Sequence, residues 1–339
     1  MFTKYKTLGM RAATAALIVG LAQGAMAETK LRMANWLPPV HHIQETFGQW
    51  IAEVEKATNG EVSIELMKAP LAPPPGQYDL VKNGAVDIAY STAAFTPNQF
   101  ALLQGVEIPF LFESAEAASA GAWQWYTDNG FDDMEFKDTK LLAVFTTAPF
   151  LLHARKPMTS LADLDGMKVR AGGVGIEILK RLGAAPVFIP PAGTTEAMER
   201  GTVDATQFPW EALAGFRLTE LSSHHLEFPQ GLYGTVFWVA MNKRSWDKLS
   251  PEAQAAIEGM GLSGSKMIGA RWDAVEASGR QGAVDQGNTI TTLSDADLAK
   301  VKDVSSFVQT DWEKMADDKG LNGSALIEEL KSQIAANAQ

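Results

Sequence analysis

Arg170 is the residue of this chain whose type and position most clearly indicate chemistry. It ends a short predicted strand at residues 167–170, and glycines follow it directly. In open α/β sheets, ligands bind beyond the carboxyl ends of the strands, so a side chain at that position faces a crevice. The guanidinium group is a planar fork of donors that fits a carboxylate with two parallel hydrogen bonds. We therefore predict a receptor site for a small organic anion.

Other strand ends carry amide and aromatic side chains. Asn35 and Trp36 follow the first predicted strand, Tyr90 follows the third, and residues 207–210 (Gln-Phe-Pro-Trp) follow a later one. One cation among amides and aromatic rings is typical of a pocket for an anion with a flat or apolar body. We expect Trp36, Tyr90, Gln207 and Trp210 to contact the ligand together with Arg170.

The elements that must position these side chains alternate between strand and helix. Strand patterns with alternating apolar residues frame a helix whose apolar residues recur on one face, at Ile43, Phe47, Trp50, Ile51 and Val54. The alternation restarts near residue 141, and the segment 235–241 is apolar on both faces, as in a central strand. The fold class is thus α/β, with largely parallel sheets covered by helices and two lobes.

The C-terminal third of the chain is predicted to be helical. Ser250-Pro251-Glu252 is a typical helix start, and the pattern continues to about residue 283 as one long helix or two, with weak points at glycines. Ser294 begins another helix with the spacing of a capping box.

Composition limits the compartment and the partners. Residues 1–27 have a basic start, a short apolar run and a cleavage pattern ending at Ala27, which predicts a signal peptide and export to the periplasm. Its removal takes away three positive charges, so the net charge falls from −11 to −14, which argues against nucleic acid and anionic membranes as partners. The absence of cysteine excludes disulfides, thiol catalysis and thiolate metal sites.

Two other kinds of site are considered and set aside. Ser263 and Lys266 have the S-x-x-K spacing of serine hydrolases, but the other motifs of those enzymes are absent. The adjacent pair His41 and His42 follows the first strand and is expected near the crevice. Neighbouring side chains normally diverge, so we predict no metal site and no cofactor.

The chain resembles the substrate-binding proteins of tripartite ATP-independent periplasmic (TRAP) transporters. The resemblance covers residues 31–328 and is most specific in LADLDGMKVR (161–170), LGAAPVFIP (182–190) and ERGTVDATQFP (199–209). It implies a two-lobed periplasmic-binding-protein fold with crossing strands and a long helix against both lobes. It also implies that Arg170 forms a salt bridge with the carboxylate of an enclosed ligand, which the receptor delivers to the membrane permease.

The same resemblance bears on the ligand and on the lobes. Phe150 stands where the sialic-acid-binding branch has a second arginine, and Pro191 stands where that branch has an aromatic residue. We therefore expect a monocarboxylate, either aromatic or a short keto or hydroxy acid, with Phe150 in the site; the place of Arg155 stays open. The expected lobes are 28–147 with 235–276, and 148–234 with 277–339. The alternatives are a periplasmic serine hydrolase and a binding protein of an ATP-driven importer.

Overall fold

Two β-sheets organise the protein, for which a computed structural model describes residues 28–338. The predicted signal peptide lies outside the described residues. The first sheet has the order β2 (Val62–Leu66), β1 (Thr29–Met33), β3 (Ile88–Thr92), β10 (Val236–Asn242), β4 (Thr139–Thr146). The second has the order β11 (Thr289–Thr292), β9 (His224–Glu227), β5 (Leu151–Ala154), β8 (Ala205–Phe208), β6 (Lys168–Ala171), β7 (Ala185–Phe188).

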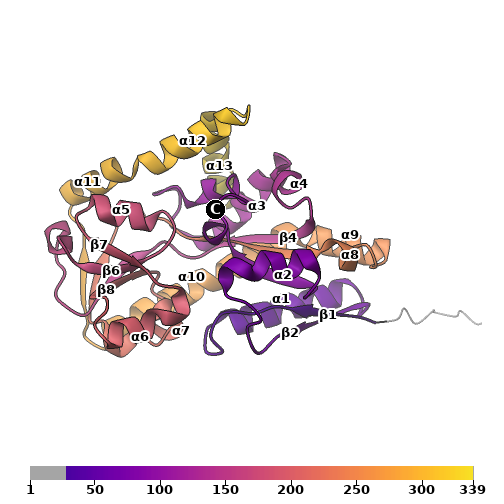
Figure 1. Ribbon diagram of the computed structural model, residues 1–339, viewed down its shortest axis with the longest axis horizontal. Helices are drawn as coiled ribbons and strands as arrows, with labels where there is room; N and C mark the ends of the chain where they lie inside the picture. Colours follow the sequence, from indigo (N-terminus) through magenta and orange to yellow (C-terminus); the bar gives the residue numbers. More distant parts are fainter. Residues whose placement is uncertain (1–27, 339) are drawn as a thin grey trace, which may run out of the picture.

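The sheets lie in separate lobes, and the chain passes between them several times (Figure 1). It leaves the first sheet after β4, returns with β10, and later joins the second sheet again as β11. The long helix α10 (Gly261–Asp285) runs across from one lobe to the other. The predicted two-lobed α/β fold with crossing strands is therefore confirmed.

Helices cover both sheets. They are α1 (Ile43–Ala57), α2 (Gln77–Asn83), α3 (Ala115–Asp128), α4 (Phe131–Glu135), α5 (Gly175–Arg181), α6 (Thr194–Glu199), α7 (Ala212–Gly215), α8 (Lys243–Trp246), α9 (Pro251–Gly259), α11 (Asp295–Ser305), α12 (Phe307–Asp318) and α13 (Gly323–Asn337). Short 3₁₀ helices occupy Pro74–Gly76, Ala93–Phe95, Leu103–Glu107, Leu161–Leu164, Pro191–Gly193 and Thr219–Leu221. None of the helices in residues 28–338 has the length and apolar character needed to cross a membrane.

The prediction of largely parallel sheets is wrong in part, because both sheets are mixed. β10 is antiparallel to β3 and to β4, and β5 is antiparallel to β8 and to β9. β5 and β10 are the strands by which the chain enters a sheet from the other lobe. They are antiparallel to their neighbours because no helical crossover within the same lobe precedes them. β10 is nevertheless central and buried along its whole length, as its two apolar faces predict.

Local sequence explains most helix boundaries. All five apolar residues of the predicted stripe in α1 are buried. Ser250 and Ser294 each accept a hydrogen bond from a backbone N–H of the turn that follows, so both are N-caps as predicted. The third strand starts later than expected, since Ala85 still donates to the carbonyl of Leu80 to close α2. Tyr90 therefore lies inside β3 rather than after it.

The helix α10 packs against both lobes through glycines. A β-carbon on Gly269 would lie 2.4 Å from the carbonyl oxygen of Ala115 in α3, and one on Gly279 would lie 2.4 Å from that of Trp210, which follows β8. The backbone of α10 thus touches an element of each lobe directly. This confirms the expected long helix that lies against both lobes.

The C-terminal helices contact the first lobe. α13 packs along α3, and the indole of Trp312 in α12 donates to the carbonyl oxygens of Ala101 and Leu102. α11, by contrast, lies beside α5 of the second lobe. We therefore propose lobe boundaries that differ from those expected from the sequence, with α12 and α13 assigned to the first lobe instead of the second.

Candidate ligand-binding site

A cavity with about 600 Å³ of empty space, including its open mouth, lies between the two lobes. Its polar lining is sparse and its aromatic lining is extensive. Both lobes and the long helix contribute rings, namely Trp36, Phe95, Phe150, Phe208, Phe216, Phe237 and Trp272. A cavity with this lining has the character of a site for one small organic molecule.

Arg170 is the cation of this cavity, and its side chain is fixed from behind. Its Nε donates to the carbonyl oxygen of Ile189 at 2.9 Å, and its Nη1 donates to that of Gln207 at 3.3 Å. The ring of Phe208 lies 4.1 Å from its Cζ. Arg170 is only 4% exposed, and no carboxylate of residues 28–338 forms an ion pair with it. Burial lowers the pKa of the guanidinium to about 10, so it stays charged at neutral pH.

Trp36 and Phe150, both predicted from the sequence, line the cavity together with Arg170. The indole N–H of Trp36 donates to the carbonyl oxygen of Tyr90 at 3.0 Å. Its ring is stacked parallel to that of Phe237, with centroids 6.3 Å apart. These contacts hold the flat face of Trp36 in a fixed position.

Tyr90, Gln207 and Trp210 do not line the cavity. Tyr90 is fully buried behind Trp36, and its hydroxyl donates to Asn35. The side chain of Gln207 is turned away and accepts from the hydroxyl of Tyr233, so only its backbone carbonyl serves the site, through Arg170. Tyr90 and Gln207 thus support lining residues, whereas the ring of Trp210 packs on His153 and His225.

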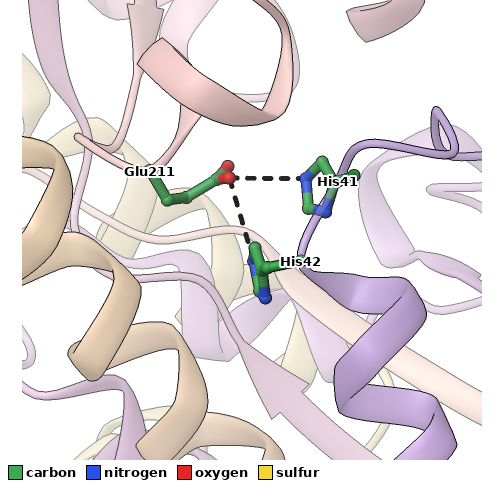
Figure 2. Close-up of side chains that lie close together, drawn as sticks. All are labelled: His41, His42 and Glu211. Carbon is green, nitrogen blue, oxygen red and sulfur yellow. Dashed lines mark ion pairs between the residues drawn. The ribbon is translucent and has the colours of Figure 1, made fainter.

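His41 and His42 both face Glu211, which follows Trp210 in the other lobe (Figure 2). The distances from Nε2 of His41 and of His42 to Oε2 of Glu211 are 3.5 and 3.8 Å. Adjacent histidines converge here because they end a turn, closed by a hydrogen bond from His41 N–H to the Pro38 carbonyl, before α1 begins. Our expectation that they diverge is wrong. Within residues 28–338, His41, His42 and Glu211 form the group of side chains whose ligand atoms lie close enough together to hold a metal ion.

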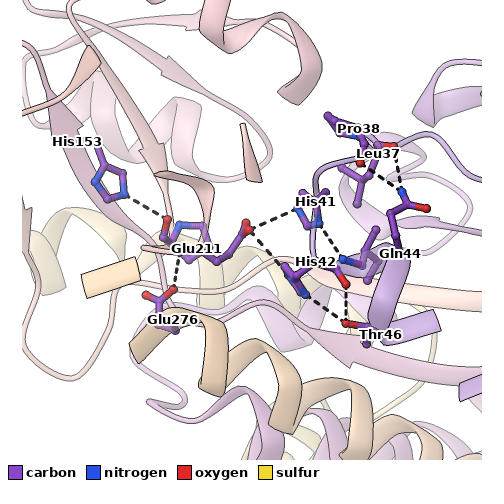
Figure 3. A network of polar contacts seen from close by, with 11 residues as sticks. Leu37, Pro38, His41, His42, Gln44, Thr46, His153, Glu211 and Glu276 are labelled. Atoms are coloured by element: carbon purple, nitrogen blue, oxygen red, sulfur yellow. Dashed lines mark hydrogen bonds and ion pairs between the residues drawn. The ribbon is translucent and has the colours of Figure 1, made fainter. Parts of the chain in front are cut away.

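The hydrogen bonds of the two histidines define their tautomers (Figure 3). Nδ1 of His41 accepts from the backbone N–H of Ile43, so its proton lies on Nε2, toward Glu211. The hydroxyl of Thr46 donates to the His42 carbonyl and therefore accepts from Nδ1 of His42, which leaves Nε2 of His42 as an acceptor. Burial lowers the pKa of His42 to about 2, so this ring is neutral.

Comparison with known proteins identifies the family. The family model for bacterial extracellular solute-binding proteins, family 7 (DctP), matches residues 33–318. The chain belongs to this family. It is 27% identical to the outer membrane transporter protein TsaT of Comamonas testosteroni, over 96% of this chain and 98% of that protein.

Solved structures of TRAP solute-binding proteins share the fold. One, from an unidentified microbe of a marine metagenome, is described as specific for aromatic acids and holds metahydroxyphenylacetate. It is 34% identical, with a TM-score of 0.84 over 92% of this chain and all of that chain. Another, from Rhodoferax ferrireducens, holds copurified benzoate. It is 30% identical, with a TM-score of 0.84 over 91% and 98% of the two chains. The predicted resemblance to TRAP solute-binding proteins is confirmed.

Sequence reasoning missed several residues that line the cavity of this family 7 protein. Glu211 directly follows the predicted strand-end segment, so its position could have drawn attention to it. Phe237 lies on a strand that is apolar on both faces, and Trp272 lies in the long helix; neither position has a local pattern that indicates a binding role.

The residues considered for other roles lie away from the cavity. The hydroxyl of Ser263 is exposed and donates to the carbonyl oxygen of Met260, whereas Lys266 pairs with Glu116. The two are not bonded to each other, as a serine nucleophile and its base would be. Arg155 is exposed and donates to the carbonyl of Met198, so it adds no second cation to the cavity.

A buried chain of hydrogen bonds supports the segment that carries Glu211. Asn288 contacts Nε2 of His225 at 3.0 Å, Nδ1 of His225 contacts Nδ1 of His153 at 2.8 Å, and Nε2 of His153 contacts the Pro209 carbonyl at 3.2 Å. The ring of Trp210 packs on both histidines. Since one nitrogen of each neutral imidazole donates and the other accepts, the chain is satisfied when both histidines are neutral.

We expect this chain of hydrogen bonds to make the stability of the folded protein depend on pH. Burial lowers the pKa of His153 to about 3 and that of His225 to about 4, whereas in the unfolded chain both take up a proton below about pH 6.5. The unfolded state thus binds more protons between pH 6.5 and 4, and each histidine costs up to about 1.4 kcal/mol of stability per pH unit as the pH falls. Glu107 and Glu276, whose pKa burial raises to about 8, act in the opposite direction between about pH 4.5 and 8.

A single substitution isolates the contribution of His153. We expect His153→Gln to lower the free energy of unfolding most above pH 7, and the difference from the wild type to shrink as the pH falls below 6.5. Urea unfolding between pH 4.5 and 8 measures this difference. His224→Gln, on the same strand as His225 but outside the chain of hydrogen bonds, is the control. A difference for His153→Gln that stays constant with pH would contradict the assignment.

Proposed function

We propose that this family 7 protein is a periplasmic receptor that binds an aromatic monocarboxylate between its lobes and delivers it to a TRAP membrane permease. The observation that carries the proposal is Arg170, a buried cation without an acidic partner among the described residues, in a cavity walled by aromatic rings. A carboxylate that pairs with Arg170 removes the cost of keeping that charge buried and unpaired.

The rest of the lining supports an aromatic ligand. Trp36 and Phe237 present stacked rings, and Phe150 and Phe208 meet edge to face beside Arg170. Aromatic pairs of this kind add roughly 0.5–1.5 kcal/mol to the burial of apolar surface. The benzoate and metahydroxyphenylacetate in the two related structures are acids of this class.

The proposal favours one carboxylate over two. Among the described residues that line the cavity, Arg170 alone is an arginine or lysine, and the apolar Phe150 stands where the sialic-acid-binding branch has a second arginine. Glu211, also in the lining, repels a second anionic group. Dicarboxylates and sugar acids are therefore disfavoured.

We infer a binding role and not a catalytic one, and a periplasmic location that follows cleavage after Ala27. The binding role and the location rest on membership of a family of extracellular solute-binding proteins, and the cleavage site rests on the sequence pattern that ends at Ala27. Closure of the lobes around the ligand excludes water from the pair between Arg170 and the carboxylate, which makes that pair stronger. The ligand favours the closed state only by its higher affinity for that state.

Calorimetry with ligand-free mature protein tests the proposal. Unfolding and refolding first removes any copurified ligand. We expect benzoate or phenylacetate to bind with micromolar or lower Kd and to change the fluorescence of Trp36 and Trp272, which line the cavity. Succinate and N-acetylneuraminate should bind at least about 100-fold more weakly. The cavity offers one ion pair and apolar contacts, which leave the second carboxylate of succinate and the hydroxyl groups of the sugar acid without partners. Tight binding of succinate without binding of either aromatic acid would refute the proposal.

A further inference from the structure

Glu211 is a buried carboxylate to which, within residues 28–338, no hydrogen bond is donated. Its side chain is 3% exposed, and its Oε2 has no hydrogen-bond partner. His41 approaches it no closer than 3.5 Å. Burying a carboxylate without donors is costly, so a group that donates to Glu211 would be bound favourably.

Glu211 and His41 line the same cavity as Arg170, at the other end of an aromatic wall. The ring of Phe208 lies against the guanidinium of Arg170, and the ring of Phe216 is stacked on Phe208 with centroids 5.0 Å apart. The rings of Phe216 and His41 then meet edge to face, with centroids 5.3 Å apart. A ligand whose carboxylate pairs with Arg170 and whose ring lies along this wall extends toward His41 and Glu211.

The two side chains offer one donor and one acceptor. Nδ1 of His41 is occupied by the N–H of Ile43, so Nε2 carries a proton that points toward Glu211, while the carboxylate of Glu211 accepts. A hydroxyl group satisfies both, because it donates to Glu211 and accepts from His41. A second carboxylate is repelled by Glu211, an ammonium group cannot accept from His41, and an unsubstituted ring leaves both unpaired.

A metal ion fits these three residues less well. To bind one, His41 must give up either its bond from Ile43 or its neutral state, because both of its nitrogens are already assigned. That leaves Nε2 of His42 and the carboxylate of Glu211 as free ligands, fewer than the three or four protein ligands usual for zinc.

We propose that His41 and Glu211 form a second polar recognition point, which selects aromatic monocarboxylates that carry a hydroxyl group on the ring. This inference rests on the proposed function, since it assumes that Arg170 holds the carboxylate. It adds a substrate class and two specificity-determining residues from opposite lobes, so the hydroxyl group also helps to hold the closed state together.

Calorimetry on matched ligand pairs tests this. The pairs are phenylacetate with its 3- and 4-hydroxy derivatives, and benzoate with 3-hydroxybenzoate, all measured with EDTA present. We expect at least one hydroxylated acid to bind the wild type about 10-fold to 100-fold more tightly than its parent, as for a hydrogen bond to a charged group. In Glu211→Ala the ratio of the two Kd values should fall below about threefold, because the hydroxyl group no longer finds an acceptor at that position.

Two further variants complete the design. Glu211→Gln keeps the shape and an acceptor, so it should retain part of the preference. Glu258→Gln, an exposed glutamate paired with Lys140, is the matched control and should retain all of it. A preference that survives in Glu211→Ala overturns the inference, and so does one that requires added Zn²⁺ and is lost in EDTA. In either case binding of the parent acids still supports the proposed function, which fails only if those acids do not bind.

Discussion

Replacing Arg170 with alanine is expected to abolish measurable binding of aromatic acids while the free protein stays folded. The guanidinium is buried and held in place by the carbonyl oxygens of Ile189 and Gln207, and its remaining N–H groups are available to the ligand. Without it, the ligand carboxylate would enter an apolar cavity unpaired. Removing one partner of a buried ion pair costs roughly 3–5 kcal/mol, which corresponds to a loss of affinity of about 100-fold to 5,000-fold.

The effect of Arg170→Ala on the stability of the free protein is expected to be smaller than for an ordinary buried residue. Arg170 has no acidic partner among residues 28–338, and burial alone lowers its pKa, so its charge is a cost to the unliganded state. Two hydrogen bonds to carbonyl groups offset part of this cost. We therefore expect the free energy of unfolding of ligand-free Arg170→Ala to lie within about 1 kcal/mol of the wild type.

The matched control is Arg155→Ala. Arg155 belongs to the same lobe but is exposed and donates to the carbonyl of Met198, away from the cavity. Calorimetry should give this variant the Kd of the wild type. Arg170→Lys keeps the charge but loses the planar fork, so it should bind with intermediate affinity. If Arg170→Ala bound the ligand with wild-type affinity, Arg170 would not be the partner of the ligand carboxylate.

The sequence predicts those parts of the site that depend on one strand and its end. The place of Arg170 in the cavity follows from the sequence because its strand, the glycines after it and the next helix are adjacent in the chain. Tyr90 was expected in the site but lies behind Trp36, because β3 starts later than the apolar pattern indicates. An error of a few residues in a strand boundary is enough to exchange a lining side chain for a supporting one.

Contacts between residues of different lobes could not be predicted from the sequence patterns. Glu211 meets His41 and His42 only because β8 of one lobe and the turn before α1 of the other end at the same cleft. Phe237 lines the cavity while its neighbour Trp238 packs into the core against Phe100, and both faces of that strand are apolar. Alternation alone cannot say which face meets a ligand when neither face is polar.

Gly269→Ala is expected to destabilise the protein strongly, because α10 crosses α3 at this glycine. An added β-carbon would lie 2.4 Å from the Ala115 carbonyl oxygen and 2.5 Å from Oγ of Ser119. Ser119 cannot turn away cheaply, since it donates to Ala115 and accepts from the N–H of Thr146 in β4. Separating the helices or breaking these buried bonds should lower the free energy of unfolding by about 3 kcal/mol.

Gly282→Ala, in the same helix, provides the matched comparison. No atom outside the local helix lies within 4 Å of a β-carbon at this position, so the substitution should raise stability by roughly 0.5–1 kcal/mol through helix propensity alone. Urea unfolding followed by circular dichroism measures both variants. If the backbone of α10 contacts α3 at Gly269, the two substitutions should change the free energy of unfolding in opposite directions. If both alanines stabilise the protein equally, that close crossing of α10 and α3 is absent.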